Sequence, residues 1–367
     1  MPPILCSLRS LRTACCLAAL FVGADTVRAE APPVTRVSDL AKSMQWVGVA
    51  VSDPDYYIWC TSPIVGPDKK IHLFCSRWPK IHKMNGWRTH SEIVHYIGEK
   101  PEGPFVLHDV AIPSNPGAPW NNTIHNPAIA QVGNQFVLLY ISFDLRKDDP
   151  AGTGKTPMFT GMAIADSING PWKVLSASGP IVAPSKNPEH WSAGTWALDN
   201  PTFLAHRGKY YIYLKGAKEQ LKSRYGYAVS DKLGGPYQLS AAYCTDNINY
   251  IEDATAFVWG NQICLLTNDN FGSHTGISGG GILWKSRSPT DFKLADAEIG
   301  FFKTTDYAKG LDFSKATKLY GPEFKFERPG ILMMSGHPAY FYGPSGFNMS
   351  GGDTTECYVM KINLPEK

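Results

Sequence analysis

The fold is decided by residues 199–214, which read DNPTFLAHRGKYYIYL. A polar doublet and a proline precede a short apolar strand, a tight turn and a second apolar strand rich in tyrosine or leucine. This phrase occurs five times, and its copies begin at Thr61-Ser62-Pro63, His125-Asn126-Pro127, Asp199-Asn200-Pro201, Glu252-Asp253-Ala254 and Glu327-Arg328-Pro329. We therefore expect five equivalent positions, at Pro63, Pro127, Pro201, Ala254 and Pro329.

Each copy continues into the same series of strands and turns. The clearest strands are short runs of β-branched or aromatic residues entered through a turn, at Ile71–Cys75, Phe136–Ser142, Tyr210–Leu214 and Ile263–Thr267. In three of the copies a Gly-Pro-aromatic marker follows further along the chain, and its ring should pack between units. The markers are Gly103-Pro104-Phe105, Gly170-Pro171-Trp172 and Gly235-Pro236-Tyr237. Large all-β repeats of this kind predict a single-domain, five-bladed β-propeller. A two-domain all-β protein is the alternative.

The N-terminus reads as a targeting segment. In residues 1–29, Arg9 and Arg12 precede an apolar run, and Val27-Arg28-Ala29 fits a cleavage site. We expect a secretory signal peptide, a propeller domain over residues 30–367, and a secreted or periplasmic protein that is not held in a membrane. Residues 1–29 contain Arg9, Arg12, Arg28 and Asp25, so their removal reduces 35 basic and 32 acidic residues to 32 and 31. This near-neutral balance argues against a nucleic-acid partner.

The cysteines point to neither a disulfide framework nor a zinc motif. The five that follow residue 29 are Cys60, Cys75, Cys244, Cys264 and Cys357. Their odd number excludes a complete set of disulfides, and Cys75 and Cys264 lie in apolar strands where small core residues are expected. The chain contains no C-x-x-C or H-E-x-x-H sequence, so no metal site is predicted.

The repeated phrases and Gly-Pro-aromatic markers resemble those of glycoside hydrolase family 43 and its relatives, families 62 and 117. The resemblance runs from about Asp53 to Leu364 and is carried by Ser76-Arg77-Trp78-Pro79, His125-Asn126-Pro127, Ile251-Glu252-Asp253 and Phe326-Glu327-Arg328-Pro329. It implies a five-bladed propeller that cleaves glycosidic bonds in an axial pocket, with inversion. Some relatives hold Ca²⁺ in the channel. This sequence offers no ligand set that decides the point, and no cofactor is expected to be required.

The chain departs from the family at the positions that carry catalysis. Ser62-Pro63 matches the first-blade Asp-Pro that supplies the general base, so that base is missing or comes from elsewhere, for example from Asp55. Asn126-Pro127 matches the second-blade Asp-Pro, whose carboxylate tunes the pKa of the general acid. Asp199-Asn200-Pro201 matches the third-blade Glu-Gly-Pro that carries this acid. Only one of the three positions keeps a carboxylate, so the resemblance implies a rearranged site.

Glycoside hydrolysis needs one protonated and one ionised carboxyl whose environments separate their pKa values. The repeats bring four candidates toward one end of the channel, namely Asp199, Glu252, Asp253 and Glu327. We expect Asp199 to be the base and Glu252 the acid, with Glu327 as the alternative acid. Glu252 and Asp253 are neighbours, so only one should face the channel unless the strand begins irregularly. The competing interpretation is that these carboxylates cap turns or pair with Arg328 and Lys325.

Other side chains suit sugar recognition, because aromatic faces stack on pyranose rings while Arg and His donate hydrogen bonds. The substrate-binding candidates are Arg77, Trp78, His125, Asn126, Trp196, Asn200, His274 and Arg328. For the tryptophans, packing between blades is the competing interpretation. A buried Arg77 would need an anionic partner, and a substrate in that role would be an acidic sugar such as a uronate.

The sequence thus predicts a secreted glycoside hydrolase, exo-acting and inverting, with a plant or algal oligosaccharide or polysaccharide as its partner. Two other functions remain open. A non-catalytic carbohydrate-binding propeller would explain the lost family carboxylates. A glycoside phosphorylase would explain the missing first-blade aspartate.

Overall fold

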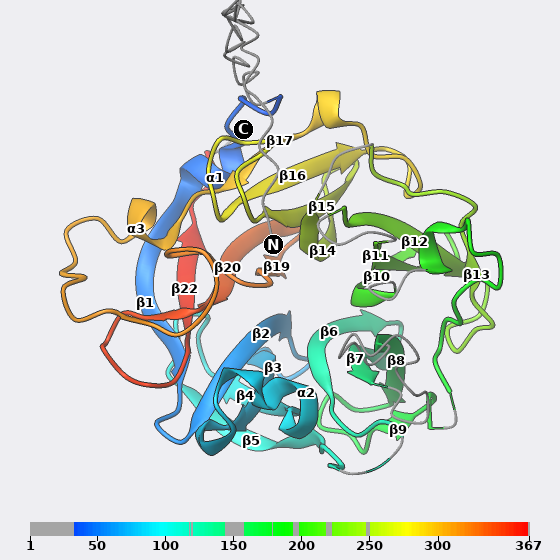
Figure 1. Cartoon of the computed structure of the whole chain (residues 1–367), viewed down its shortest axis with the longest axis horizontal. Coiled ribbons are helices and arrows are strands. Elements are labelled where there is room, and N and C mark those ends of the chain that lie inside the picture. Colours follow the sequence, from blue (N-terminus) through cyan, green and yellow to red (C-terminus); the bar gives the residue numbers. More distant parts are fainter. Residues whose placement is uncertain are drawn as a thin grey trace, which may run out of the picture. The chain divides into compact units, whose positions relative to one another are not determined.

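The computed structural model describes residues 33–116, 118, 120–143, 158–177, 179–193, 198–217, 222–246 and 250–365. Within this part of the chain five four-stranded antiparallel sheets are arranged as the blades of a propeller (Figure 1). The predicted all-β, five-bladed β-propeller is confirmed. No helix among the described residues has the length and hydropathy needed to cross a membrane.

Four blades are built from consecutive strands, each running from the axis outward. Blade 1 contains β2 (Tyr56–Val65), β3 (Ile71–Pro79), β4 (Glu92–Gly98) and β5 (Phe105–Ile112). Blade 2 contains β6 (His125–Val132), β7 (Gln135–Phe143), β8 (Met158–Ala165) and β9 (Lys173–Val174). Blade 3 contains β10 (Asp199–His206), β11 (Lys209–Gly216), β12 (Arg224–Ser230) and β13 (Gln238–Leu239). Blade 4 contains β14 (Ile251–Trp259), β15 (Gln262–Asp269), β16 (Gly280–Ser286) and β17 (Glu298–Phe301).

The fifth blade closes the ring by joining both ends of the domain. Its inner strands are β19 (Gly330–Met334), β20 (His337–Ser345) and β22 (Glu356–Ile362), and its outer strand is β1 (Met44–Ser52). Antiparallel pairing of β1 with β22 runs from Met44↔Ile362 to Ser52↔Glu356. The remaining elements are small: β18 (Thr317–Lys318), β21 (Phe347–Asn348), α1 (Asp39–Ser43), α2 (Trp87–His90), α3 (Thr304–Tyr307) and the 3₁₀ turns Lys80–His82, Met84–Gly86, Trp191–Ala193 and Leu294–Asp296.

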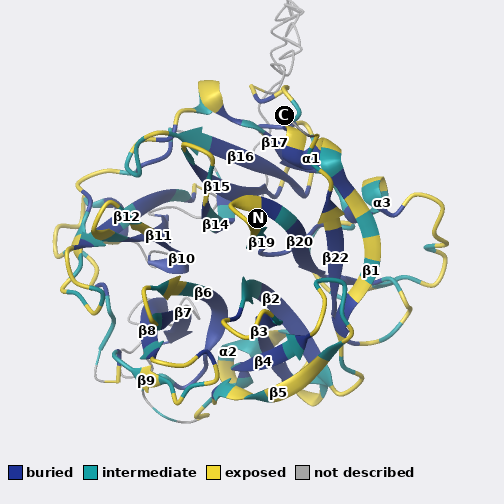
Figure 2. Ribbon diagram, turned by 180° about the vertical axis from the view of Figure 1, so that it is seen from behind, coloured by how far each residue is buried: buried dark blue, intermediate teal, exposed yellow. Residues whose placement is uncertain are grey.

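The hydrophobic core is divided among the five interfaces between blades. Each interface holds its own cluster of buried side chains, and the one between blades 5 and 1 includes Leu332, Tyr342, Leu73 and Val94. The predicted packing of the Gly-Pro-aromatic rings is confirmed, since Phe105, Trp172 and Tyr237 pack against three of these clusters. Buried residues fill the inner strands, whereas exposed ones lie on β5 and the connecting loops (Figure 2). All five described cysteines are buried and unpaired by disulfides.

Candidate active site

Blades 1 to 4 each begin with an irregularity that turns two successive side chains toward the axis. In blades 1 to 4 the pairing of the first two strands shifts register at Trp59/Ser62, His125/Ala128, Asp199/Thr202 and Glu252/Thr255. The second residue of the last four phrases has a positive φ, between 32° and 59°, at Asn126, Asn200, Asp253 and Arg328, and in blade 1 Cys60 has one of 52°. Such bulges re-aim side chains that a regular strand would send to opposite faces. Glu252 and Asp253 therefore both line the cavity.

This geometry corrects the expected alignment of blade 1. The register shifts make Thr61 equivalent to Pro127, Pro201, Ala254 and Pro329, whereas Pro63 lies two residues further along β2, opposite Leu73. The predicted equivalence of Pro63 is therefore wrong, because this proline lies within the regularly paired part of β2 and not at the irregularity. Trp59, not Ser62, is the β2 residue that lines the cavity.

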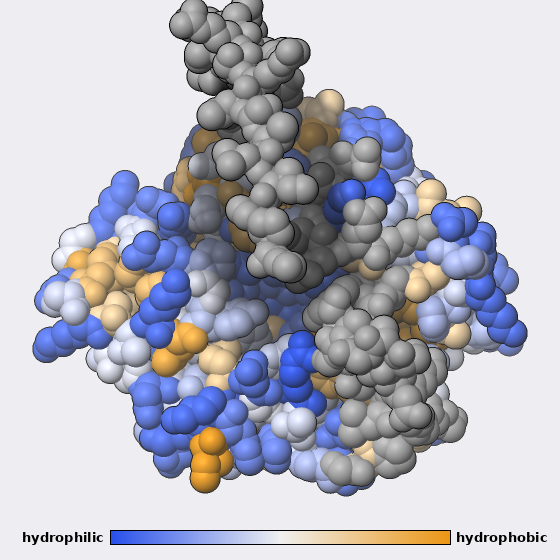
Figure 3. Space-filling view, viewed as in Figure 1, coloured by the Kyte–Doolittle hydropathy of each residue, from blue (hydrophilic) through white to orange (hydrophobic). Residues whose placement is uncertain are grey.

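The first residues of the five phrases surround a cavity of about 260 Å³ at one end of the axis. We call them the cavity ring: Trp59, His125, Asp199, Glu252 and Glu327. On the face that Figure 1 presents, hydrophilic residues are visible both near the centre and around the rim (Figure 3). The cavity ring thus forms a small polar pocket with carboxylates on blades 3, 4 and 5.

The second residues of the phrases form an axial ring that closes the floor of this cavity: Cys60, Asn126, Asn200, Asp253 and Arg328. Asn126 Nδ2 donates to Asn200 Oδ1 at 2.5 Å, and Asn200 Nδ2 donates to Asp253 Oδ1 at 2.8 Å. Asp253 Oδ2 accepts from Asn268 Nδ2 at 3.0 Å and from the Arg328 backbone N–H at 3.2 Å. Asp253 thus has hydrogen bonds on both oxygens, which suits a structural role for its carboxylate.

Five charged residues at the cavity alternate in sign across three blades. Lys215, on β11, lies 3.4 Å from Asp199 Oδ2 and 3.1 Å from Glu252 Oε2. Lys325 lies 3.4 Å from Glu252 Oε1 and 2.5 Å from Glu327 Oε2. The order is therefore Asp199, Lys215, Glu252, Lys325 and Glu327, with a carboxyl group at each end. We call this series the charge chain.

The carboxyls at the two ends differ from the one in the middle. Asp199 Oδ1 and Glu327 Oε1 are buried with no hydrogen-bond partner among the described residues. Glu252 instead uses both oxygens, since Asn270 Nδ2 also donates to its Oε1. An unpaired buried carboxyl oxygen is costly, and a substrate group or water in the cavity can satisfy it.

The two end carboxyls also differ from the middle one in pKa. Burial raises the pKa of Asp199 to about 7, and it raises the pKa of Glu327 to about 7 against the opposing effect of Lys325. Burial also disfavours the charge of Glu252, but Lys215 and Lys325 outweigh it and lower this pKa to about 2. Asp199 and Glu327 can therefore exchange protons near neutral pH, whereas Glu252 stays ionised.

Aromatic side chains form the walls of the cavity. Trp59, Trp78, Trp87, Tyr250 and Tyr320 all line it. Tyr320 is 52% exposed and meets Trp59 edge-on, with 5.9 Å between ring centroids. Apolar ring faces beside a few fixed polar groups are typical of pockets that bind sugars.

The structure brings together most of the predicted site residues. The four predicted carboxylates line the cavity together with the substrate-binding candidates Trp78, His125, Asn126 and Asn200. His125 stacks on Trp87 at 5.0 Å and bonds Ser91 Oγ through Nδ1 at 2.8 Å. Burial, aided by Arg328, lowers the pKa of His125 to about 3, so its imidazole is neutral.

Other predicted residues lie elsewhere. Arg77 does not line the cavity; its Nε donates to Glu92 Oε1 at 2.9 Å, so the expected anionic partner is a residue of the same blade. The argument for an acidic sugar therefore loses its basis. His274 lies in a loop held by Asp269, whose Oδ2 accepts from the His274 backbone N–H at 3.0 Å. Asp55 is exposed, and Trp196 lies outside the described residues.

Sequence reasoning missed Lys215, the lysine that lies between Asp199 and Glu252 in the charge chain. Lys215 follows four buried apolar or aromatic residues of β11. A single basic residue after such a run was the signal in the sequence that could have identified it. Arg328 belongs to the axial ring, where its Nη2 donates to the Pro201 carbonyl. It stabilises the floor of the cavity rather than lining it.

The cavity does not fit a calcium ion. Glu252, Asp253 and Glu327 can place one oxygen each within 4.8 Å of one another. The ammonium of Lys325 contacts two of these carboxylates, so a cation of this chain already neutralises them. A divalent ion would have to displace it, and the donor set of this cavity therefore argues against a channel Ca²⁺.

The fold and the cavity define a five-bladed propeller with a carboxylate-lined axial pocket. No protein-family profile and no curated protein match the sequence. Solved structures do match its fold. A family 117 glycoside hydrolase from the marine bacterium Zobellia galactanivorans is 14% identical, covers 91% of this chain and 92% of its own, and has a TM-score of 0.59.

Two further structures are similar to the same extent. A GH43_1 enzyme from Xanthomonas citri is 12% identical, with 88% of this chain and 92% of its own covered and a TM-score of 0.54. A β-xylosidase/α-arabinofuranosidase of family 43 from a compost microbial metagenome, in complex with xylotriose, is 14% identical, with 89% and 95% covered and a TM-score of 0.56. These three structural neighbours are glycoside hydrolases, and the chain shares their propeller fold.

Proposed function

We propose that this protein is a glycoside hydrolase that uses Asp199 and Glu327 as its acid and base. The observation that carries the proposal is the pair of buried, unpartnered carboxyl oxygens at the two ends of the charge chain, both on groups with a pKa near 7. A general acid and a general base work best when their pKa values lie near the working pH. Glu252 then keeps its charge and holds both lysines in place.

The assignment differs from the roles expected for Asp199 and Glu252 from the sequence. Asp199 is the better acid, because the ammonium beside it is 3.4 Å away, whereas Glu327 has the ammonium of Lys325 at 2.5 Å. Asp199 also occupies the third-blade position where the family resemblance places the general acid. The pKa of Glu327 is about 7 like that of Asp199, so we assign Glu327 as the base on the closer ammonium, which stays beside its carboxylate while it activates water.

The pocket supports attack at the end of a sugar chain. Its volume is at the small end of ligand pockets, and the axial ring closes its floor, so a terminal sugar unit fits better than the middle of a polymer. Asp199 and Glu327 lie on blades separated by blade 4, which supports the wider carboxyl spacing of inverting enzymes. We propose an exo-acting, inverting enzyme for plant or algal oligosaccharides or polysaccharides.

We further propose that the protein is exported, because residues 1–29 have the charge and apolar pattern of a secretory signal. Structural neighbours solved with xylose or xylotriose support a neutral carbohydrate as the substrate class. Lys215 and Lys325 are both paired with carboxylates, so neither is free to hold phosphate as a phosphorylase would require.

The test uses aryl glycosides with good and poor leaving groups, together with plant and algal oligosaccharides. Asp199→Asn should lose roughly a thousandfold in rate on poor leaving groups but far less on good ones, since these need no proton. Glu327→Gln should lose a similar factor on all of them. Asp231→Asn, which changes an exposed carboxylate on the surface, is the control.

The outcomes separate the three functions. Rates that neither variant changes would contradict the carboxyl assignment. Release that depends on added phosphate would identify a phosphorylase. Sugar binding without release, retained by Asp199→Asn and Glu327→Gln, would identify a binding propeller instead.

A further inference from the structure

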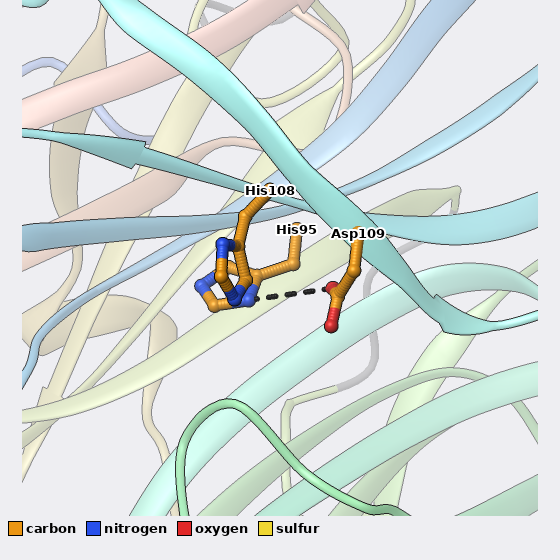
Figure 4. Close-up of side chains that lie close together, drawn as sticks. All are labelled: His95, His108 and Asp109. Carbon is orange, nitrogen blue, oxygen red and sulfur yellow. Dashed lines mark ion pairs between the residues drawn. The ribbon is translucent and has the colours of Figure 1, made fainter.

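A second cluster of ligand-type side chains lies on the outer half of blade 1. His95 is on β4, and His108 and Asp109 are on β5; Figure 4 shows the three side chains pointing toward one another. One ligand atom from each lies within 4.8 Å of the other two. None of the three lines the cavity, so this cluster is separate from the carboxylates of the charge chain.

An irregularity of the β4–β5 ladder builds the cluster. His95 pairs with Asp109 and Tyr96 pairs with Leu107, which leaves His108 as an extra residue between them. In a regular strand His108 and Asp109 would point to opposite faces. The bulge lets both side chains reach His95, and bulges that re-aim side chains are common beside functional sites.

A hydrogen-bond relay fixes which nitrogen of His95 carries a proton. Asp68 Oδ1 lies 3.0 Å from His72 Nε2, and His72 Nδ1 lies 2.7 Å from His95 Nε2. The Asp68 carboxylate can only accept, so His72 Nε2 donates and His72 Nδ1 accepts. His95 Nε2 must then donate, which leaves its Nδ1 as a bare lone pair. Both rings are fully buried.

This lone pair points at another acceptor. His95 Nδ1 lies 3.6 Å from Asp109 Oδ1, and both atoms are buried without a hydrogen-bond partner in the described part of the chain. Two acceptors that face each other without a hydrogen repel, and a cation between them removes the repulsion. We propose that His95 Nδ1, His108 and Asp109 bind a divalent transition-metal ion, with Zn²⁺ the best match.

The chemistry of the three residues supports this choice. Two imidazoles and one carboxylate suit zinc and its neighbours, whereas Ca²⁺ and Mg²⁺ prefer oxygen ligands only. Two ligands on one tetrahedral zinc ion, with bonds of about 2.0–2.1 Å, lie about 3.4 Å apart, close to the observed separation. The relay through His72 to Asp68 is the outer support that metal-binding histidines usually have. His108 is exposed, which gives the ion a path from solvent.

The test is calorimetric titration of the chelator-treated, full-length folded protein with ZnCl₂. Wild type should bind one equivalent at micromolar concentration and gain thermal stability. His108→Ala and Asp109→Asn should each weaken binding by roughly tenfold or more. Both residues are at the surface end of the cluster, so the variants should fold, which circular dichroism checks.

Two histidine variants serve as controls. His337→Ala removes an exposed histidine from blade 5, and His82→Ala disrupts the stacked His82–His90 pair, whose ring centroids are 3.5 Å apart. Neither should change the affinity. Binding that is lost only in His82→Ala, or kept in both cluster variants, would place the ion elsewhere. No binding by wild type at millimolar Zn²⁺ would mean that His95 and Asp109 share a proton instead.

Discussion

Lys215 links two carboxylates of different function, because its ammonium contacts both Asp199 and Glu252. Replacing it with methionine removes a positive charge that lowers both pKa values. We expect Lys215→Met to raise the pKa of Asp199, to move the alkaline limb of the pH–rate profile upward, and to reduce kcat about 10–100-fold. Lys209→Met is the matched control, since it removes an exposed lysine from the same strand. An unshifted alkaline limb would contradict the role of Asp199 as acid.

Asp199 also makes stability depend on pH. Its pKa is about 7 in the folded chain and near 3.8 when unfolded, so the unfolded state loses its proton first as the pH rises. Folding stability should therefore fall between about pH 4 and pH 7 and level off above pH 7. Asp199→Asn removes this loss, so we expect its stability relative to wild type to be higher at pH 8 than at pH 4 by on the order of 4 kcal/mol.

Urea unfolding of wild type and Asp199→Asn at pH 4 and pH 8 measures this effect. Asp231→Asn, a change at an exposed carboxylate, should follow wild type at both values. A pH dependence that Asp199→Asn leaves intact would show that Asp199 is ionised throughout. Asp199 would then be unsuitable as a general acid near neutral pH.

At the scale of single elements, Trp191 shows how one ring can fix two strands. The indole packs on Gly216 of β11 and Gly226 of β12, and a Cβ at Gly226 would lie 2.4 Å from Trp191 Cζ2. We expect Gly226→Ala to lower the free energy of unfolding by about 1–3 kcal/mol, as overpacking does. Gly179→Ala, where a Cβ would meet nothing within 4 Å, should be close to neutral. Equal urea midpoints for the two variants would contradict this packing.

Elements also show what the sequence could and could not reveal. The strands at Phe136–Ser142 and Tyr210–Leu214 were predictable because apolar, β-branched and aromatic residues fill them, and the structure has them as parts of β7 and β11. The positive φ at Asp253 was not predictable, because a bulge depends on the pairing of two strands rather than on the residue type alone. The misplaced equivalence of Pro63 has the same cause.

The candidate site was predictable to the extent that the repeats converge. The phrases placed Asp199, Glu252 and Glu327 at one end of the axis, where the structure has them. Their order of pKa values was not predictable, since Lys215 and Lys325 set it from outside the aligned phrase positions. Charged residues that contact one another from different strands have no regular spacing in the sequence.

At the scale of the whole molecule, the ring depends on the contact between blades 5 and 1. There β1 completes blade 5, and Leu332 is fully buried in the cluster that joins this blade to blade 1. Leu332→Ala leaves a cavity at this interface and should cost about 2–5 kcal/mol. Leu311→Ala, at an exposed leucine, should cost much less.

The closed ring also predicts how the loss of stability in Leu332→Ala appears in an unfolding experiment. All five blades contribute to the cavity ring, so opening one interface separates residues that must stay together for the pocket to exist. We expect Leu332→Ala to unfold in one transition, with tryptophan fluorescence near the cavity and far-ultraviolet circular dichroism changing at the same urea concentration. Two separate transitions would show that the blades unfold independently. The position of the charge chain would then depend on local contacts between blades 3, 4 and 5, not on closure of the ring.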